Sequence, residues 1–341
     1  MKIISLSFFS FSLATMGIAT ISNAEPTKGS NEPRELKIIS DRTEAHLTPI
    51  FAAFEKKNNV KIKSVFMDNG LINRLETRPT EADVVITKDA ELLEIARQKK
   101  LLQSYDTKTI NTILSADFRD PSNMYFVDAF RARVIFYSTD RVKESDLSTY
   151  ENLASPQWKG KFCVRSGFHD YNLSLFGQFF SFYGPQKTKE IIKGLHSNLA
   201  KNPTGNDREQ AKAIMEGKCD VALANNYYYP IMQSIPEQQS WAKAVKVFYP
   251  NQKEKGTFVM RSAAGLTTSK TNITLANAFL EYLVSTEAQS LMVNATFQYP
   301  ANKQAPNAPT FKTNFIPLKD IAAPREEVTK FLTEIAFDKK Q

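Results

Sequence analysis

The sequence predicts an α/β fold of two lobes, in which each lobe is a doubly wound mixed sheet flanked by helices. Strand and helix patterns alternate from Leu36 to Lys99, which is typical of a doubly wound sheet. A second alternating stretch begins at Phe162, and the long extended run Phe126 to Tyr137 precedes it. Two such units joined by an extended segment describe a hinged clamshell, which closes over a ligand held by loops at strand ends.

The first unit opens on a short apolar strand, Leu36 to Ile39, and Ser40 to His46 is expected to be its exit loop. Pro49 suits the first turn of a helix that runs to Lys57, because a proline loses no hydrogen bond there. We expect this lobe to comprise residues 36–133 and 258–300. Its other predicted elements are the strand Val60 to Phe66, the helix Leu71 to Leu75, the strand Ala82 to Thr87, the helix Ala90 to Lys99, the extended segment Gly256 to Leu266, and the helices Thr274 to Val284 and Glu287 to Asn294.

The second unit is expected over residues 134–257, and residues 301–341 are expected to return to it. Polar loops follow its strands, and the carboxyl ends of strands are where open α/β sheets place their ligands. Its predicted elements are the strand Phe162 to Arg165, the exit loop Ser166 to Tyr171, the helices Asn172 to Phe182, Lys187 to Leu199 and Arg208 to Glu216, the strand Val221 to Ala224, and a last helix from Arg325 to Phe337.

Residues 1–24 have the pattern of a secretory signal peptide. Lys2 is the only charged residue, an apolar region follows it, and Ser22, Asn23 and Ala24 place small residues at the cleavage positions. A membrane anchor is the alternative, but serine and threonine interrupt the apolar run and no second segment of spanning length follows. We expect cleavage near Ala24, a periplasmic product, and a disordered leader over residues 25–35.

The formal net charge of the whole chain is +8, yet its lysines and arginines are dispersed rather than clustered, so nucleic acid is not expected as a partner. The two cysteines, Cys163 and Cys219, are an even count in an exported chain, and each lies beside an apolar run. One disulfide is therefore predicted, with two buried free thiols as the alternative. Zinc is not expected, because the cysteines lack ligand spacing and the chain has three histidines.

Three consecutive tyrosines, Tyr227 to Tyr229, follow the apolar strand Val221 to Ala224 after two asparagines. They stand at the carboxyl end of that strand, where a ligand is expected. A phenol becomes a good ligand only after it loses its proton, so adjacent tyrosines favour a hard, highly charged cation, and ferric iron fits best. Half-buried aromatic side chains with solvated hydroxyl groups are the alternative interpretation.

Several separated stretches share their order and spacing with one family. They are Glu81 to Thr87, Arg131 to Tyr137, Leu153 to Gly160, Gly205 to Lys212, Ala224 to Tyr228, Tyr249 to Gln252 and Gln298 to Pro300. On these stretches the chain, from about Leu36 to Asn302, resembles the periplasmic ferric-ion-binding proteins, a branch of the extracellular solute-binding proteins that serve ABC importers. The resemblance implies the type II periplasmic-binding-protein clamshell, Fe(III) as cargo, no enzymatic activity, an inner-membrane ABC permease as partner, and a monomer.

In that family, phenolates of the second lobe hold the iron. The resemblance carries this role over to the adjacent pair Tyr227 and Tyr228 and to Tyr171, which lies on the loop after the Cys163 strand, while Tyr229 is expected to support or pack behind them. Arg131 matches a basic residue that balances charge or pairs with a synergistic anion such as carbonate. Some members bind that anion at the positions of Ser166, Gly167 and Asn225, although ordinary turn and capping roles fit these residues equally.

The first lobe departs from the family pattern. Many members follow the first strand with Ser-x-Arg-His-Tyr, whose last two residues complete the metal sphere, whereas this chain has Ser40-Asp-Arg-Thr-Glu44. Glu44 offers a carboxylate oxygen, which a hard cation accepts. His46 is the other candidate ligand in this stretch, and water or a bound anion is the alternative to both.

Two other functions compete with iron binding. One keeps the clamshell but holds a small anion or an organic solute, with Arg131, Arg133 and Arg165 as its contacts. The other is a secreted hydrolase or transferase that uses the adjacent His169 and Asp170. The sequence has no Gly-x-Ser-x-Gly elbow, no His-Glu-x-x-His motif and no phosphate-binding glycine loop, so we expect a binding protein and no enzyme.

Overall fold

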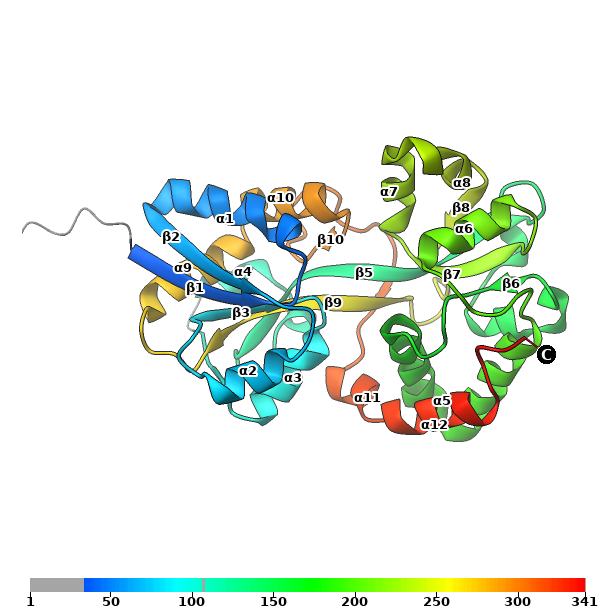
Figure 1. Cartoon of the computed structure of the whole chain (residues 1–341), viewed down its shortest axis with the longest axis horizontal. Coiled ribbons are helices and arrows are strands. Elements are labelled where there is room, and N and C mark those ends of the chain that lie inside the picture. Colours follow the sequence, from blue (N-terminus) through cyan, green and yellow to red (C-terminus); the bar gives the residue numbers. More distant parts are fainter. Residues whose placement is uncertain (1–33, 106–107, 341) are drawn as a thin grey trace, which may run out of the picture. The chain divides into compact units, whose positions relative to one another are not determined.

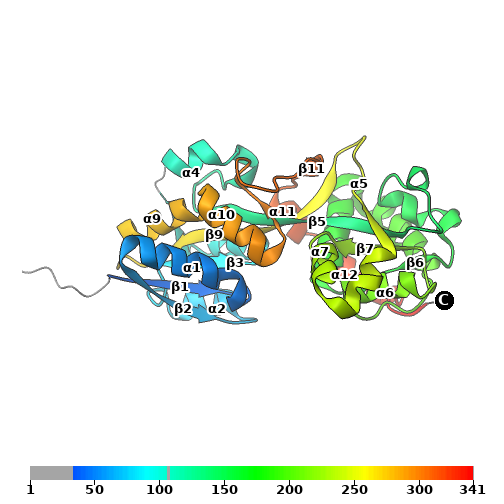
Figure 2. The same ribbon diagram turned by 90° about the horizontal axis from the view of Figure 1, so that it is seen from above.

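Two long strands, β5 (Tyr125–Ser138) and β9 (Thr257–Thr267), connect the two halves of the fold (Figures 1 and 2). The computed structural model describes residues 34–105 and 108–340, so the predicted signal peptide lies outside the described residues. β5 pairs with β9 as far as Ala132, and from Arg133 onward it pairs with β7 (Val221–Asn225). One strand therefore contributes to the sheets of both lobes, and the predicted two-lobed α/β arrangement is observed.

The first lobe is a mixed sheet in the order β2-β1-β3-β9-β5. β1, β2 and β3 are parallel, and β9 runs antiparallel to both β3 and β5. Short strands β4 and β10 add antiparallel pairs to β9 and β5. The elements of this lobe are β1 (Arg34–Ser40), α1 (Glu44–Asn58), β2 (Val60–Phe66), α2 (Leu71–Thr77), β3 (Val84–Thr87), α3 (Ala90–Gln98), β4 (Leu102–Gln103), α4 (Lys108–Ile113), a 3₁₀ turn (Ala116–Phe118), α9 (Ile273–Leu283), α10 (Thr286–Thr296) and β10 (Tyr299–Pro300).

In the second lobe, β5 lies between β7 and β8, both antiparallel to it, and β6 runs parallel to β7. α5 (Asp170–Ser197) contains the two helices predicted for that stretch, because Gly184 leaves the helical conformation with a φ of 71°. The other elements are four 3₁₀ turns (Glu144–Asp146, Glu151–Ala154, Pro156–Trp158, Pro236–Gln238), β6 (Phe162–Cys163), α6 (Asp207–Met215), α7 (Tyr228–Ser234), α8 (Gln239–Lys243), β8 (Val245–Phe248), β11 (Thr313–Asn314), α11 (Leu318–Ala322) and α12 (Arg325–Glu334).

Two boundaries near the start of the described chain differ from the prediction. β1 begins at Arg34, so the last two residues of the predicted leader over residues 25–35 belong to a strand. α1 begins at Glu44, so Pro49 lies inside the helix and the exit loop of β1 is shorter than expected. A proline at this position leaves the Ala45 carbonyl without its helical partner, and the exposure of Ala45 makes that loss tolerable.

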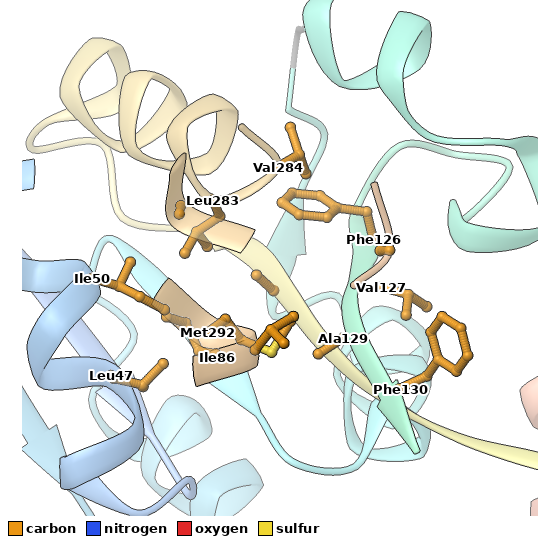
Figure 3. Packing of buried hydrophobic residues seen from close by; sticks show 14 of the residues in the cluster. Leu47, Ile50, Ile86, Phe126, Val127, Ala129, Phe130, Leu283, Val284 and Met292 are labelled. Atoms are coloured by element: carbon orange, nitrogen blue, oxygen red, sulfur yellow. The ribbon is translucent and has the colours of Figure 1, made fainter. Parts of the chain in front are cut away.

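The core of the first lobe fixes the loops that follow its parallel strands (Figure 3). Leu47 and Ile50 of α1 pack with Ile86 of β3, Phe126 of β5 and Met292 of α10, and all five side chains are buried. Burial of one such side chain stabilises a fold by about 1.5–3 kcal/mol. This packing fixes the positions of β1 and β3, and so of the loops that follow them.

The predicted disulfide between Cys163 and Cys219 is confirmed. The Cα atoms of the two cysteines are 5.9 Å apart, and both residues are buried. The bridge joins β6 to the turn that precedes β7, which are the two strands whose following loops carry the tyrosines predicted to bind metal. It therefore ties together the bases of the two loops.

Removal of this disulfide should lower the free energy of unfolding by about 2–4 kcal/mol, because the bridge restricts the unfolded chain over a long loop. The two cysteines are separated by 56 residues in sequence. Urea unfolding of Cys163→Ala/Cys219→Ala, followed by circular dichroism, measures the loss. Wild-type protein with its bridge reduced is the control, because it keeps both sulfur atoms, and equal midpoints for its reduced and oxidised forms would contradict the prediction.

Residues 34–105 and 108–340 contain no helix that is long and apolar enough to cross a membrane. The chain from Arg34 onward forms one compact unit, so the division into residues 36–133 with 258–300 and residues 134–257 with 301–341 stays a prediction. The change in the partner of β5, from β9 at Ala132 to β7 at Arg133, lies at the predicted boundary.

Candidate functional site

A cavity of about 410 Å³, which we call the tyrosine cavity, takes its walls from both lobes. The three tyrosines predicted to bind metal all line it. The complete lining consists of Arg42, Thr43, His46, Lys88, Arg131, Tyr171, Arg208, Tyr227, Tyr228, Ile231, Ala295, Thr296, Phe297 and Gln298. The fold therefore brings residues of α1, β5, α5, α6, α7 and α10, and of the loops after β1 and β3, to one place.

The three tyrosines converge in this cavity. The hydroxyl oxygens of Tyr171 and Tyr227 are 3.2 Å apart, which is within hydrogen-bonding distance. The rings of Tyr227 and Tyr228 have centroids 4.2 Å apart and planes inclined by 36°. Side chains from two separate loops thus present phenol groups to one small volume.

The local fold explains this convergence. β7 ends at Asn225, Tyr227 is the N-cap of α7, and Tyr228 is its first residue, so the adjacent tyrosines stand at the carboxyl end of a buried strand. Pro230 fits the first turn of α7. Tyr171 lies in the first turn of α5, after β6, and β6 runs parallel to β7. Parallel neighbours end at the same edge of a sheet, so their exit loops meet there.

Burial raises the pKa values of the two adjacent tyrosines. Loss of solvent, and then the negative charge of a neighbouring Tyr171 phenolate, raises the pKa of Tyr228 to about 12. The pKa of Tyr227 is raised well above its ordinary value by burial and by the two neighbouring tyrosines, against the lowering effect of Arg131. Both phenols therefore keep their protons at neutral pH, and a cation that binds them has to displace those protons.

Positive charge surrounds Tyr171. The guanidinium carbons of Arg165, Arg131 and Arg133 lie 5.1, 5.4 and 5.8 Å from the centroid of its ring, within the range of a cation–π attraction. Arg131 is buried in β5, and its Nη1 donates to the Lys88 carbonyl at 2.8 Å, which links β5 to the loop after β3. Among the described residues that line the cavity, four are cationic and none is a carboxylate: Arg42, Lys88, Arg131 and Arg208.

Asp207 holds two of these arginines beneath Tyr171. Its Oδ2 accepts hydrogen bonds from Arg133 Nη1 at 2.7 Å and from the Asn225 backbone at 2.8 Å, and its Oδ1 accepts one from Arg165 Nη1 at 3.4 Å. Asp207 and Arg133 are fully buried. Neither Arg133 nor Arg165 lines the cavity, so the fold pairs them with this carboxylate rather than presenting them to an anionic ligand.

In the first lobe, His46 lines the cavity and Glu44 does not. Glu44 is the exposed first residue of α1. Each helical residue turns by about 100°, so side chains two residues apart point to nearly opposite faces. Burial, and then Arg42, lowers the pKa of His46, which leaves its imidazole neutral at pH 7 and able to bind a metal. The structure therefore brings His46, and not the predicted Glu44 carboxylate, to the tyrosines.

The residues that the resemblance assigned to an anion have other partners. Ser166 Oγ donates to Asp338 Oδ2 at 2.5 Å, and the Gly167 backbone donates to Asp338 Oδ1 at 2.7 Å. Asn225 is fully buried, and its Oδ1 accepts a hydrogen bond from Nη1 of Arg133 on β5. Tyr229 packs on an aromatic ring of β5, which agrees with its expected packing role. None of the four lines the tyrosine cavity, and these contacts give no support to anion binding by the first three.

The adjacent His169 and Asp170 have structural partners. His169 is the N-cap of α5, where its Nδ1 accepts a hydrogen bond from the Tyr171 backbone at 3.2 Å. Burial, and then Arg165, lowers the pKa of His169 to about 4. Asp170 pairs with Arg325 of α12. Both residues therefore shape the start of α5.

Several lining residues were missed by the sequence prediction. Arg42 lies two residues after the end of β1 and Lys88 directly follows β3, so the strand-end rule that selected the tyrosines also points to them. Phe297 and Gln298 have no such signal, because only the packing of α10 on α1 brings them to the cavity. Within the described ranges, no three His, Cys, Asp or Glu side chains form a group that could hold a metal.

Comparison with known proteins decides the family. Residues 80–319 match the model of the family described as bacterial extracellular solute-binding protein. The chain belongs to this family.

Iron uptake protein A2 of Synechocystis sp. is 36% identical over 290 residues, which cover 83% of each chain. Ferric iron-binding protein A of Mannheimia haemolytica, solved in an open conformation, has a TM-score of 0.82 and 36% identity, covering 89% of this chain and 99% of that one. A Trichodesmium protein in complex with iron and citrate ligands has a TM-score of 0.82 and 33% identity, with the same coverage.

Membership of the extracellular solute-binding proteins settles two of the questions raised by the sequence. The likeness to these structures confirms the type II periplasmic-binding-protein fold, and the family consists of transport proteins rather than enzymes. Clamshell proteins of this kind hold their ligand between the lobes. The tyrosine cavity, with walls from both lobes, is therefore the candidate ligand site of this solute-binding protein.

Proposed function

We propose that this solute-binding protein captures Fe(III) and delivers it to an ABC importer. Relatives named as an iron uptake protein and a ferric iron-binding protein support iron as the cargo. The observation that carries the proposal is the convergence of three tyrosines, in which the hydroxyl oxygens of Tyr171 and Tyr227 are 3.2 Å apart and Tyr228 lies beside them. Three phenolates together match the three charges of a ferric ion.

Tyr171, Tyr227 and Tyr228 are the proposed ligands, because phenolate oxygen is a hard donor suited to a hard cation. The remaining positions around the ion fall to His46, or to water or an anion such as carbonate beside Arg131, since Glu44 lies outside the cavity lining. Arg131 offsets the negative charge of the phenolates, and its bond to the Lys88 carbonyl holds its guanidinium beside the loop after β3. Closure of the lobes over the ion would exclude water and strengthen these electrostatic contacts.

The proposed cargo fits an exported protein. Residues 1–24 have the pattern of a cleaved signal peptide, and a buried disulfide is typical of an oxidising compartment such as the bacterial periplasm. Delivery requires that the permease of an inner-membrane ABC importer recognise the loaded clamshell. We expect the protein to perform this role as a monomer.

Visible titration with ferric citrate tests the proposal directly. Electron transfer from phenolate to ferric iron absorbs visible light, so the purified, chelator-treated protein should become coloured and saturate at about one iron per chain. Iron loading should also raise the thermal midpoint, because a ligand that binds only the folded state stabilises it. A protein that stays colourless and shows no thermal shift would refute iron binding.

Iron loading should release protons, and iron affinity should rise with pH. Because the pKa of Tyr228 is about 12 and that of Tyr227 is also raised, both phenols are protonated at pH 7 and lose a proton when iron binds. Each displaced proton lowers the apparent affinity about tenfold for every pH unit of acidification below these pKa values. Competition against a chelator of known speciation, at several pH values between 6 and 8, measures the slope.

The variant Tyr227→Phe/Tyr228→Phe is the control for buffer and dilution, because it is expected to take no iron from the donor. After correction for the protons that the donor takes up when it gives up its iron, the wild type should release at least about two protons for each iron bound at pH 7. An affinity that stays constant from pH 6 to pH 8, after correction for the chelator, would exclude binding through these two phenolates.

A second candidate cargo is a small anion or an organic carboxylate without metal. The four cationic residues that line the cavity, with no carboxylate among the described lining residues, favour it. Calorimetric titration with citrate or carbonate in the absence of iron distinguishes the two. Heat of binding that persists without iron and in the double phenylalanine variant supports an organic cargo, whereas binding that requires iron supports the metal.

A further inference from the structure

The segment that follows α12, residues 335–340, which we call the tail, contacts the loop that carries Tyr171. α12 ends at Glu334, whereas the sequence predicted a helix to Phe337, because Ala336 adopts a left-handed φ of 49°. The N–H groups of Ala336 and Phe337 donate back to carbonyls of the last helical turn at 3.1 and 3.0 Å, which is the pattern of a Schellman cap. This turn directs the tail away from the axis of α12.

Asp338 of the tail accepts the free donors at the start of the loop. One carboxylate oxygen accepts from Ser166 Oγ at 2.5 Å and the other from the Gly167 backbone at 2.7 Å. The adjoining Phe337 is fully buried, and a Cβ added to Gly167 would come within 2.5 Å of its ring. The Lys339 carbonyl anchors the tail further, because it accepts a hydrogen bond from Nε2 of His196 on α5 at 2.7 Å. Both polar and packing contacts therefore hold the tail against this loop.

A short series of hydrogen bonds leads from this anchor to Tyr171. Ser166 Oγ accepts from the Phe168 backbone at 3.2 Å, and the Ser166 carbonyl accepts from the His169 backbone at 3.2 Å. His169 Nδ1 then accepts from the Tyr171 backbone at 3.2 Å at the start of α5. The turn between the tail contact and the tyrosine thus has little freedom, and a shift at Ser166 would be passed on to the phenol.

We propose that Asp338 is a positioning residue for the Tyr171 phenol. Its carboxylate accepts hydrogen bonds from Ser166 and Gly167, the two residues that the family resemblance assigned to a bound anion. This inference rests on the proposed function. Tyr171 and Tyr227 follow different strands, so one ion can bind both only while the two segments keep the hydroxyl oxygens close to the observed separation of 3.2 Å. Loss of the Asp338 contacts leaves every proposed ligand in the chain but loosens one of the two loops that present them.

The test measures iron release and the visible spectrum of Asp338→Ala. We expect iron to pass to an excess of a strong chelator about tenfold faster than from the wild type, since two hydrogen bonds to a carboxylate are lost. We also expect the phenolate-to-iron absorption band to shift or weaken. Glu334→Ala is the matched control, because it removes an exposed carboxylate from the last turn of α12 and leaves Asp338 in place. This control should release iron at the wild-type rate.

Ser166→Ala is a second variant that removes one donor and keeps the carboxylate, so it remains informative if Asp338→Ala does not fold. Its release rate should lie between those of the wild type and Asp338→Ala. A lower thermal midpoint in either variant, with unchanged band and release rate, would show a purely structural role and overturn the proposal while iron binding stands. A wild-type protein that never becomes coloured would instead refute the proposed function, and this inference with it.

Discussion

Tyr227→Phe/Tyr228→Phe is expected to lose iron binding altogether while the fold is kept. Each substitution deletes one hydroxyl group and preserves the ring, so the packing of the two rings, with centroids 4.2 Å apart, remains possible. The variant retains only Tyr171 among the three proposed phenolates. Residues that merely support metal ligands change affinity by about 10–100-fold, so the loss of two ligands should exceed that range. Titration with ferric citrate should give no visible band.

Tyr229→Phe is the matched control for this prediction. Tyr229 belongs to the same run of tyrosines, but it packs on Phe136 of β5 and does not line the tyrosine cavity. Its substitution should leave the colour and the stoichiometry of the iron complex unchanged. Full colour in the double variant, or its loss in Tyr229→Phe, would contradict the ligand assignment.

Asp207→Asn is expected to destabilise the protein by about 3–5 kcal/mol, because it removes the negative charge from a buried ion pair and leaves its cationic partners unpaired. Asp207 and Arg133 are fully buried, with Oδ2 and Nη1 2.7 Å apart, and Arg165 lies 3.4 Å from Oδ1. The asparagine has nearly the same shape, so the effect reports on charge rather than on a cavity. Urea unfolding followed by circular dichroism gives the change in midpoint.

The same substitution should also weaken iron binding, since Arg133 and Arg165 lie under the ring of Tyr171. Asp220→Asn is the control, because Asp220 pairs with Arg141 at 2.6 Å in a partly exposed position, where an ion pair contributes at most about 1 kcal/mol. Equal unfolding midpoints for Asp207→Asn and Asp220→Asn would show that the buried pair does not stabilise the fold as expected.

The regular elements of the first lobe were largely predictable from sequence. β2 has the predicted bounds Val60–Phe66, because alternation along a half-buried strand is a local property. The start of α1 differs from the prediction, because Pro49, which suits a first helical turn, lies inside the helix. That difference matters for the site. The stretch around Glu44 is part of a helix instead of the predicted exit loop, and helical geometry points the side chains of Glu44 and His46 to different faces.

The second lobe shows the same division between local and long-range information. The strand before the tyrosines follows from its apolar run, and β7 extends it by a single residue, Asn225. Helix α7, which begins at Tyr228, was not predicted, although Pro230 in its first turn is a compatible signal. The disulfide follows from the even number of cysteines in an exported chain. The pairing of β6 with β7 brings the two Cα atoms to within 5.9 Å.

The sequence alone determined that adjacent tyrosines stand at the end of a buried strand in a two-lobed α/β protein, because the pattern of a strand and the residues after it depend on neighbouring positions in the chain. The resemblance also named Tyr171, but only the tertiary structure decided how the distant side chains are arranged around them. It placed Tyr171 beside Tyr227, turned His46 rather than Glu44 toward the cavity, and bound Ser166 to Asp338. These pairings depend on strand order and helix rotation. Both are set by the packing of the whole core, and no short stretch of sequence is enough to predict that packing.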